Sequence, residues 1–138
     1  MTSGVILDTG PLVAIIDQDE QHHDWAISQL QTIAPPLLTC DAVLAEACYL
    51  LRKHPTAIKQ IESYCSTGVL TSCYSAGDDL ESVFALMRKY RDAPMSFADA
   101  CLVRIIETGA GRIVFTLDGH FKIYRQKGRR RIDTIAPD

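Results

Sequence analysis

Apolar residues along this chain follow two alternating patterns, short continuous runs and longer stretches in which they recur every three or four positions. The continuous runs at residues 5–7 and 113–116 predict buried strands. Residues 37–40 also read as a strand, and residues 70–74 are a strand candidate. The periodic stretches predict helices over residues 11–17, 20–33, 42–53, 56–66, 78–90 and from the cap at Ser96 to Gly109. A weaker last strand is expected at residues 131–135. Strands that alternate with helices predict an α/β fold in which helices cover both faces of a mostly parallel sheet.

The same patterns predict where two helices begin and which side chains two of them bury. Asp41 and Ser96 are good N-caps for the third and the last helix. The core stripe of the third helix is expected to consist of Val43, Leu44, Ala47, Leu50 and Leu51. The fourth helix is expected to bury Ile58, Ile61 and Cys65.

Length and composition indicate an ordinary folded protein. The 138 residues fit one domain, and we expect residues 1–138 to form it. Hydrophobic residues make up 47% of the chain and charged residues 22%, which is typical of a soluble globular protein. The longest nearly apolar stretch, residues 11–16, is too short to cross a bilayer, and the N-terminus lacks the features of a secretory signal. We therefore expect a cytoplasmic protein without membrane attachment.

The cysteines agree with that location. There are five, without the CxxC or Cys/His spacing of a zinc site, and an odd number does not suggest a disulfide framework. Reduced thiols, several of them buried as small hydrophobic side chains, are the expectation for Cys40, Cys48, Cys65, Cys73 and Cys101.

Charge is distributed unevenly along the chain. The net charge of −3 does not by itself favour nucleic-acid binding. Six of the 14 basic residues nevertheless lie between Lys122 and Arg131, namely Lys122, Arg125, Lys127, Arg129, Arg130 and Arg131. Such a run is typical of a phosphate contact or of a solvated segment, and the sequence leaves both interpretations open.

Four acidic residues lie where the predicted elements would bring them together. Asp8 follows the first strand, Glu46 lies in the first turns of the helix after the second strand, and Asp118 follows the strand at 113–116. Asp99 lies in the first turn of the helix that begins after Ser96. In open parallel sheets, sites form outside the carboxyl ends of the strands. We therefore expect the four carboxylates to meet in one crevice.

Each acid taken alone has a simpler explanation, such as a turn at Asp8 or a capping box between Ser96 and Asp99. Their joint placement argues for a site that holds a cation. Two carboxylates about 4 Å apart repel by roughly 4 kcal/mol at an effective dielectric constant near 20. Hard oxygen ligands favour Mg²⁺ or Mn²⁺, and hydrolysis of phosphodiesters is the reaction that such a site serves.

Four segments around these acids resemble motifs of the PIN-domain nucleases, and most closely the VapC-type toxins of bacterial toxin–antitoxin pairs. The similar segments are residues 5–14, the helix carrying Glu46, residues 94–103 and residues 116–121. They occur in the family's order, and the resemblance extends from Val5 to about Ile135. It implies a three-layer α/β/α sandwich with a central mostly parallel sheet, an Mg²⁺ or Mn²⁺ cofactor, and endoribonuclease activity.

The resemblance also implies roles for individual residues and partners. Asp8, Glu46 and Asp99 would be the main metal ligands, directly or through water, and Asp118 a more peripheral one. By their adjacency to these acids, Thr9 and Thr116 are expected to orient a carboxylate or a water molecule. Members of the toxin family usually form homodimers that a small antitoxin neutralises, so a homodimer and an antitoxin partner are expected beside the RNA substrate.

Two other classes of protein stay open at this point. A PIN-like fold can serve as an RNA- or protein-binding module without catalysis, although the complete set of acids argues against that. A receiver-like signalling domain also places acids and Mg²⁺ at the edge of a parallel sheet. It would need a phosphoacceptor Asp at the end of a middle strand and a Lys at the end of a late one, and Thr116 is followed by Leu117 and Asp118 instead.

Overall fold

A parallel sheet of five strands runs through the middle of the computed structural model, which describes residues 1–138. Its strands are β1 (Val5–Leu7), β2 (Leu37–Cys40), β3 (Leu70–Tyr74), β4 (Ile113–Phe115) and β7 (Asp133–Ile135). They lie side by side in the order β3-β2-β1-β4-β7, and every neighbouring pair is parallel. β1 is therefore the central strand, with β2 and β3 on one side of it and β4 and β7 on the other. The strand order reverses at β1, which in such sheets is where ligands bind, beyond the carboxyl ends of the strands.

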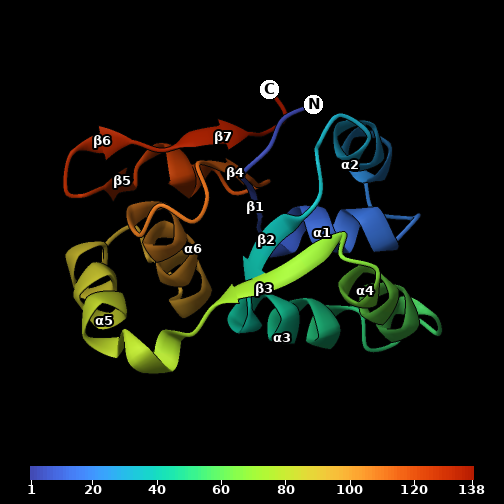
Figure 1. The fold of residues 1–138 in the computed structure, drawn as a ribbon, viewed down its shortest axis with the longest axis horizontal. Helices are drawn as coiled ribbons and strands as arrows, with labels where there is room; N and C mark the ends of the chain where they lie inside the picture. The colour runs from blue at the N-terminus through green and yellow to red at the C-terminus, as the bar shows by residue number, and fades with distance from the viewer.

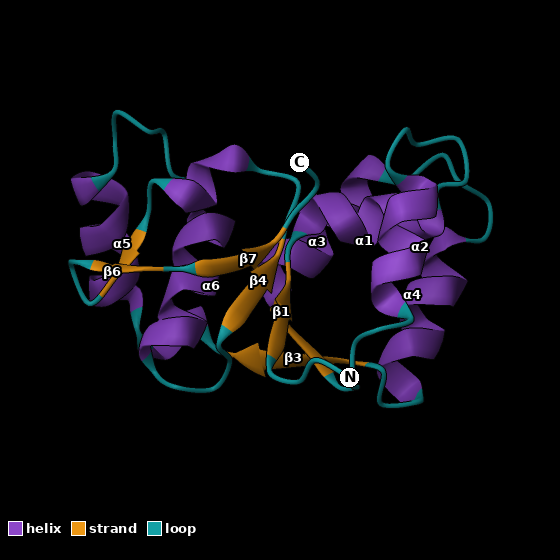
Figure 2. Cartoon of the chain, turned by 90° about the horizontal axis from the view of Figure 1, so that it is seen from above, coloured by secondary structure: helices purple, strands orange, loops and turns teal.

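Helices cover both faces of this sheet. They are α1 (Thr9–Ile16), α2 (His23–Leu30), α3 (Asp41–Leu50), α4 (Ala57–Ser66), α5 (Leu80–Lys89) and α6 (Phe97–Glu107). Figure 1 shows the arrangement of these elements, and Figure 2 shows α5 and α6 on one side of the sheet and α1, α2 and α4 on the other. This confirms the predicted α/β/α sandwich. No helix has the length and apolar character needed to cross a membrane.

The apolar runs predicted the main strands well and the C-terminal segment poorly. The predicted strands at 5–7, 37–40 and 70–74 are present. β4 ends one residue earlier than predicted, although the Thr116 N–H still donates to the Ile135 carbonyl on β7 at 3.0 Å. The last predicted strand is split. Residues 130–131 form β6 (Arg130–Arg131), which pairs with β5 (Arg125–Gln126) in a separate antiparallel hairpin, and only 133–135 join the sheet.

The predicted helices are all present, but several are shorter than expected. α2 covers His23–Leu30 instead of residues 20–33, and α3 ends at Leu50. Asp41 is the first residue of α3 rather than its N-cap, and its carboxylate accepts a hydrogen bond from the Ser72 hydroxyl on β3. Cys40 occupies the cap position without a side-chain hydrogen bond.

Two of the predicted core stripes were partly wrong. In α3, Val43, Ala47 and Leu51 are buried and Leu44 is partly buried, but Leu50 is 53% exposed because it lies at the rim of a surface crevice. In α4, Ala57 and Ile61 are buried, whereas Ile58 lies beside this stripe and is exposed. Cys65 continues the four-residue spacing but is also exposed, one residue before the helix ends. All five cysteines are free thiols, and two of them, Cys40 and Cys101, are buried in the core.

Candidate active site

A crevice of about 500 Å³ opens at the carboxyl ends of β1 and β4. Its lining includes all four acids singled out from the sequence, Asp8, Glu46, Asp99 and Asp118. A fifth carboxylate, that of Glu20 in the loop before α2, also lines it, and sequence reasoning missed this residue. Residues from four separate parts of the chain therefore meet at the point where the strand order reverses.

Asp8 is the most deeply placed of these acids. It follows β1 directly, its N–H donates to the Phe115 carbonyl on β4 at 3.0 Å, and its side chain caps α1 by accepting the Thr9 N–H at 2.8 Å. Only 6% of the residue is exposed. Burial raises the pKa of Asp8 to about 7, and the charges of Asp99 and Asp118 add to this rise, while hydrogen bonds from Thr116 and Thr9 oppose it.

Thr116 connects the first acid with the fourth. Its hydroxyl donates to Asp8 Oδ2 at 2.7 Å and accepts the Asp118 N–H at 2.9 Å. With 1% of the residue exposed, this hydroxyl has no competing contact with solvent. Thr9, the other threonine singled out from the sequence, also lines the crevice, and its buried hydroxyl makes no hydrogen bond within the protein.

Asp99 is held from two sides. On its own helix, the Ser96 hydroxyl accepts the Asp99 N–H at 3.0 Å and Asp99 Oδ2 accepts the Ser96 N–H at 3.3 Å, the capping box that the sequence predicted. On the other side, the hydroxyl of the fully buried Tyr124 donates to the same Oδ2 at 2.9 Å. Burial raises the pKa of Asp99, whereas the hydrogen bond from Tyr124 opposes that shift.

Tyr124 is a site residue that sequence reasoning missed. It lies within the basic run, which reads as a surface segment. The available signal was its spacing from Phe121, because the two aromatic residues lie three positions apart beside a short helical turn, η2 (Gly119–Lys122). Both rings are completely buried and pack edge to face, with centroids 5.2 Å apart.

The remaining two acids are more open to solvent. Asp118 caps η2 by accepting the His120 N–H at 2.9 Å, and the same oxygen lies 2.9 Å from His120 Nδ1. Its side chain is 34% exposed. Glu46 is exposed on α3 and takes part in none of the side-chain hydrogen bonds or ion pairs of the protein, so its position is not fixed by a neighbour.

These residues fit a hydrated divalent cation better than a tightly enclosed one. No group of three or more acidic, histidine or cysteine side chains is close enough together to surround a single ion. Most of the donors that face the crevice are hard oxygens, from the five carboxylates and the unpartnered Thr9 hydroxyl. The one nitrogen side chain in the lining, His120, is paired with Asp118. Mg²⁺ prefers such ligands, keeps several of its waters and binds through one or two carboxylates. A cation would also favour the ionised form of Asp8, whose pKa is raised mainly by burial and further by the charges of Asp99 and Asp118.

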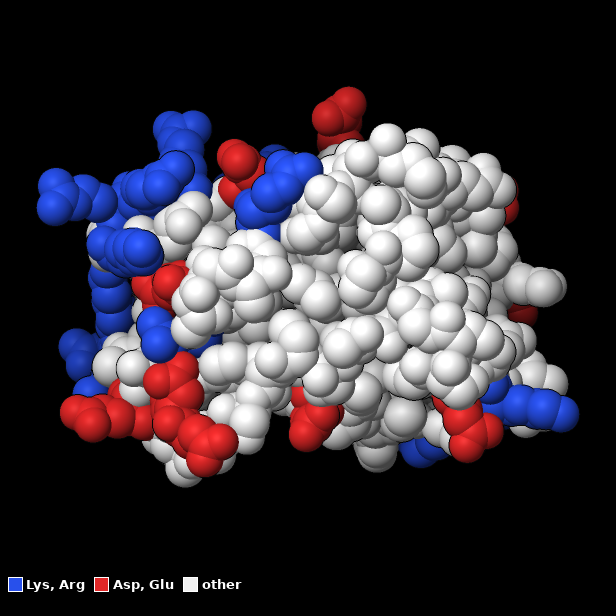
Figure 3. All heavy atoms as spheres, viewed as in Figure 1, with Lys and Arg blue, Asp and Glu red and all other residues white.

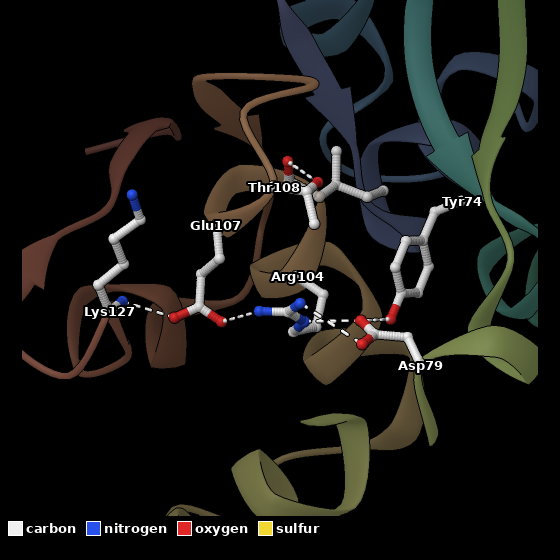
Figure 4. Close-up of polar contacts among 7 residues, drawn as sticks. Tyr74, Asp79, Arg104, Glu107, Thr108 and Lys127 are labelled. Atoms are coloured by element: carbon white, nitrogen blue, oxygen red, sulfur yellow. Dashed lines mark hydrogen bonds and ion pairs between the residues drawn. The ribbon is translucent and has the colours of Figure 1, made fainter. Parts of the chain in front are cut away.

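A second polar cluster, outside the crevice, fixes the helix that carries Asp99. Arg104 on α6 donates through Nε to Asp79 at 2.7 Å and through Nη1 to Glu107 at 3.2 Å, as Figure 4 shows. The Tyr74 hydroxyl on β3 donates to the same Asp79 carboxylate at 2.6 Å. The bond from Arg104 lowers the pKa of Asp79. Because these groups satisfy one another and none lines the crevice, we assign the cluster a structural role.

Comparisons with known proteins agree with this geometry. Residues 5–127 match the PIN domain. The chain is 27% identical to ribonuclease VapC26 of Mycobacterium tuberculosis over 136 residues, which cover 95% of this chain and 99% of that protein. Its fold is similar to the crystal structure of VapC20 from the same organism, which is described as a sarcin-ricin loop cleaving toxin. The TM-score is 0.74 and the sequence identity 18%, and the match covers 83% of this chain and 90% of the VapC20 chain. Since the family match spans most of its length, the chain belongs to the PIN-domain family.

Proposed function

We propose that this protein is a metal-dependent endoribonuclease that hydrolyses RNA phosphodiester bonds in the crevice at the carboxyl ends of β1 and β4. The observation that carries the proposal is the meeting of Asp8, Glu46, Asp99 and Asp118 in one crevice, with two of them buried and held by hydroxyl groups. The similarity to ribonuclease VapC26 over nearly the whole chain supports RNA as the substrate.

The four acids would have different roles as metal ligands, according to how firmly hydrogen bonds hold each side chain. Bound Mg²⁺ or Mn²⁺ would polarise the phosphoryl group and lower the pKa of a coordinated water. Asp8 and Asp99 are the fixed ligands, because Thr116 and Tyr124 orient one oxygen of each. Glu46 is free to adjust to the substrate from the exposed face of α3. Asp118, tied to His120, is the more peripheral ligand.

The biological setting that fits this activity is that of a toxin. Both relatives carry VapC names, and VapC20 is described as a toxin. We propose that the protein acts in the cytoplasm, forms a homodimer, and is neutralised by a small antitoxin protein that enters the acidic crevice. These proposals rest on the family resemblance, and size-exclusion chromatography with light scattering well above micromolar concentration checks the dimer.

Cleavage of a mixed RNA pool tests the proposed activity. Purified protein is incubated with Mg²⁺, with Mn²⁺ and with EDTA, beside the variants Asp8→Asn and Asp99→Asn. We expect metal-dependent cleavage that falls at least about 100-fold in each variant, a loss of about 3 kcal/mol of transition-state stabilisation. Asp78→Asn is the matched control, because Asp78 is exposed on the short helical turn η1 (Ala76–Asp78) and does not line the crevice.

Three results would contradict this assignment or redirect it. Full cleavage by both crevice variants would place the active site elsewhere. Equal loss in Asp78→Asn would point to a general effect of charge removal. Absence of cleavage with any metal, combined with retained RNA binding, would favour the non-catalytic binding module over the nuclease.

A further inference from the structure

The basic run near the C-terminus folds into a feature that the proposed active site does not use. Its strands β5 and β6 form a short hairpin outside the main sheet. Lys127 and Gly128 in the turn both have positive φ angles, and the Arg129 N–H closes the turn by donating to the Gln126 carbonyl at 3.2 Å. The φ of +82° at Gly128 suits glycine, which has no Cβ to clash. The hairpin thus has a defined shape rather than that of a loose tail.

The hairpin concentrates positive charge that no acid neutralises. Residues 122–131 contain six cationic side chains and no acidic one, in a chain whose net charge is −3. None of these residues takes part in an ion pair. Arg125 is committed to the fold, because its guanidinium donates to three main-chain carbonyls. The other five, Lys122, Lys127, Arg129, Arg130 and Arg131, are all exposed.

This arrangement does not serve the stability of the hairpin. Arg125 lies directly opposite Arg131 in the strand register. Like charges at opposed positions destabilise a strand pair. Glu107, the acid that contacts the turn, accepts the Lys127 main-chain N–H, and Figure 4 shows the Lys127 ammonium group pointing away from it. A polyanion bound from outside would neutralise this charge.

None of residues 122–131 lines the acidic crevice, but the hairpin is connected to it through Tyr124 and through the segment that precedes it. His120 lines the crevice, and the exposed Lys122 follows it by two residues. Tyr124, which leads into β5, donates its hydroxyl to Asp99. On the other side, Lys89 Nζ at the end of α5 lies 3.5 Å from the Gly128 carbonyl. The last turn of α5, which contains Arg88 and Lys89, therefore adds positive charge next to the hairpin. Figure 3 shows Lys and Arg gathered over the part of the molecule where Figure 1 draws β5 and β6.

We propose that residues 122–131 form an arm that binds the phosphate backbone of the RNA strand next to the bond that is cleaved. The inference rests on the proposed function and names its substrate-binding surface. The crevice itself repels RNA, since its lining carries five carboxyl side chains, so a cationic surface beside it is needed to hold the strand there. Arginine suits this task because its planar guanidinium makes paired hydrogen bonds to phosphate. Such contacts position a strand without reading its bases.

Salt-dependent RNA binding tests the arm. Fluorescence anisotropy with a short, labelled, unstructured single-stranded RNA is measured in EDTA, which prevents metal-dependent cleavage. In the triple variant Arg129→Gln, Arg130→Gln and Arg131→Gln, we expect the slope of log K against log salt to fall by about 2, because each phosphate contact on a single strand contributes about 0.7. With Mg²⁺ present, KM for cleavage should rise while kcat stays near the wild-type value.

Two controls separate charge at this surface from folding and from total charge. The triple variant with lysine at the same three positions keeps the charge and should retain the wild-type slope. The double variant Lys53→Gln and Lys59→Gln removes exposed cations near α4, away from the hairpin, and should also retain it. If the triple glutamine variant does not fold, the single Arg130→Gln variant gives the same test at about a third of the effect.

The outcomes distinguish this inference from the proposed function. A wild-type protein that binds RNA through the three arginines but cleaves nothing would uphold the arm and overturn the ribonuclease. An unchanged slope in the glutamine variants would overturn the arm while leaving cleavage intact. Equal affinity for a poly-glutamate of matching charge would assign the surface to an acidic protein and would also overturn the arm.

Discussion

The acidic crevice and the basic hairpin are neighbours in the fold, and they hold their charges in opposite ways. In the crevice, buried hydroxyls fix the carboxylates: Thr116 is 1% exposed and Tyr124 is completely buried. In the hairpin, five cations are exposed and form no ion pair. A catalytic group must be held in one geometry, whereas long-range attraction for a polyanion needs only charge of the right sign. Substitutions in the crevice should therefore change kcat, whereas substitutions in the hairpin should change KM and the salt dependence of RNA binding.

The largest expected effect is on stability and comes from the burial of Asp8. Its pKa is raised from 3.8 to about 7, so the folded protein keeps this proton at pH values where the unfolded chain has lost it. The folded state is therefore progressively destabilised as pH rises from about 4 to about 7, by up to about 4 kcal/mol from this group. In EDTA, thermal denaturation should show a lower Tm at about pH 8 than at about pH 5.

The same experiment reports on the metal. Saturating Mg²⁺ favours the ionised carboxylate and should reduce the Tm difference between the two pH values. Asp8→Asn carries no titrating group at this position, so most of both effects should disappear. A pH profile of Tm that is identical in the wild type and in Asp8→Asn would show that the burial of this carboxyl does not limit stability.

Next in size is the effect of removing the hydroxyl that links two acids. Thr116→Val keeps the shape of the side chain but loses the bonds to Asp8 Oδ2 and to the Asp118 N–H. Partners that orient metal ligands typically contribute about 10- to 100-fold to metal affinity or activity. We expect a loss of that order in kcat or in Mg²⁺ affinity, measured by cleavage at varied metal concentration. Thr71→Val, at an exposed position on β3, is the control, and wild-type rate and affinity in Thr116→Val would rule out the role.

A smaller change is expected in Tyr124→Phe. The ring and its packing against Phe121 are retained, and one hydrogen bond to Asp99 is lost. A hydrogen bond of this kind contributes about 0.5–1.5 kcal/mol, which corresponds to about a 2- to 10-fold change in rate. We expect this decrease in kcat with little change in KM. A change confined to KM would indicate that Tyr124 acts through the hairpin rather than through Asp99.

The smallest effect is expected from one charge in the hairpin. Arg130→Gln should leave kcat and Tm unchanged and should lower the slope of log K against log salt by about 0.7. A clear decrease in kcat would contradict the separation between a fixed crevice and an exposed arm. Comparison with Thr116→Val in the same assay makes the contrast direct.

The sequence predicted those parts of this protein that depend on hydrophobic pattern and order along the chain. The strands β1, β2 and β4 are largely buried in the middle of the sheet, and they read as mostly apolar runs. The β5–β6 hairpin was missed because two-residue strands of charged and polar residues carry no such pattern. Its fold depends on the turn at Gly128 and on the anchoring of Tyr124, which only the tertiary structure brings into contact.

Part of the candidate site, its four acids, could also be predicted from the order of elements along the chain. The four acids could be placed in one crevice because each lies close to the end of a strand or the start of a helix. Glu20 and Tyr124 could not be placed there, because Glu20 begins a predicted helix that follows another helix rather than a strand, and Tyr124 lies in the basic run. Leu50 was assigned to the core because helical periodicity does not distinguish the edge of a buried stripe from the rim of a crevice, where it lies.

The central position of β1 has a consequence for the timing of synthesis. Asp8 takes its hydrogen bond from Thr116, which follows it by 108 residues, and its strand pairs with β4. A nascent chain that ends before β4 therefore lacks both the second neighbour of β1 and the hydroxyl that orients the first acid. Because domains fold as their segments emerge from the ribosome, the crevice forms only when the last part of the chain has been made. Incomplete chains should thus be unable to cut RNA.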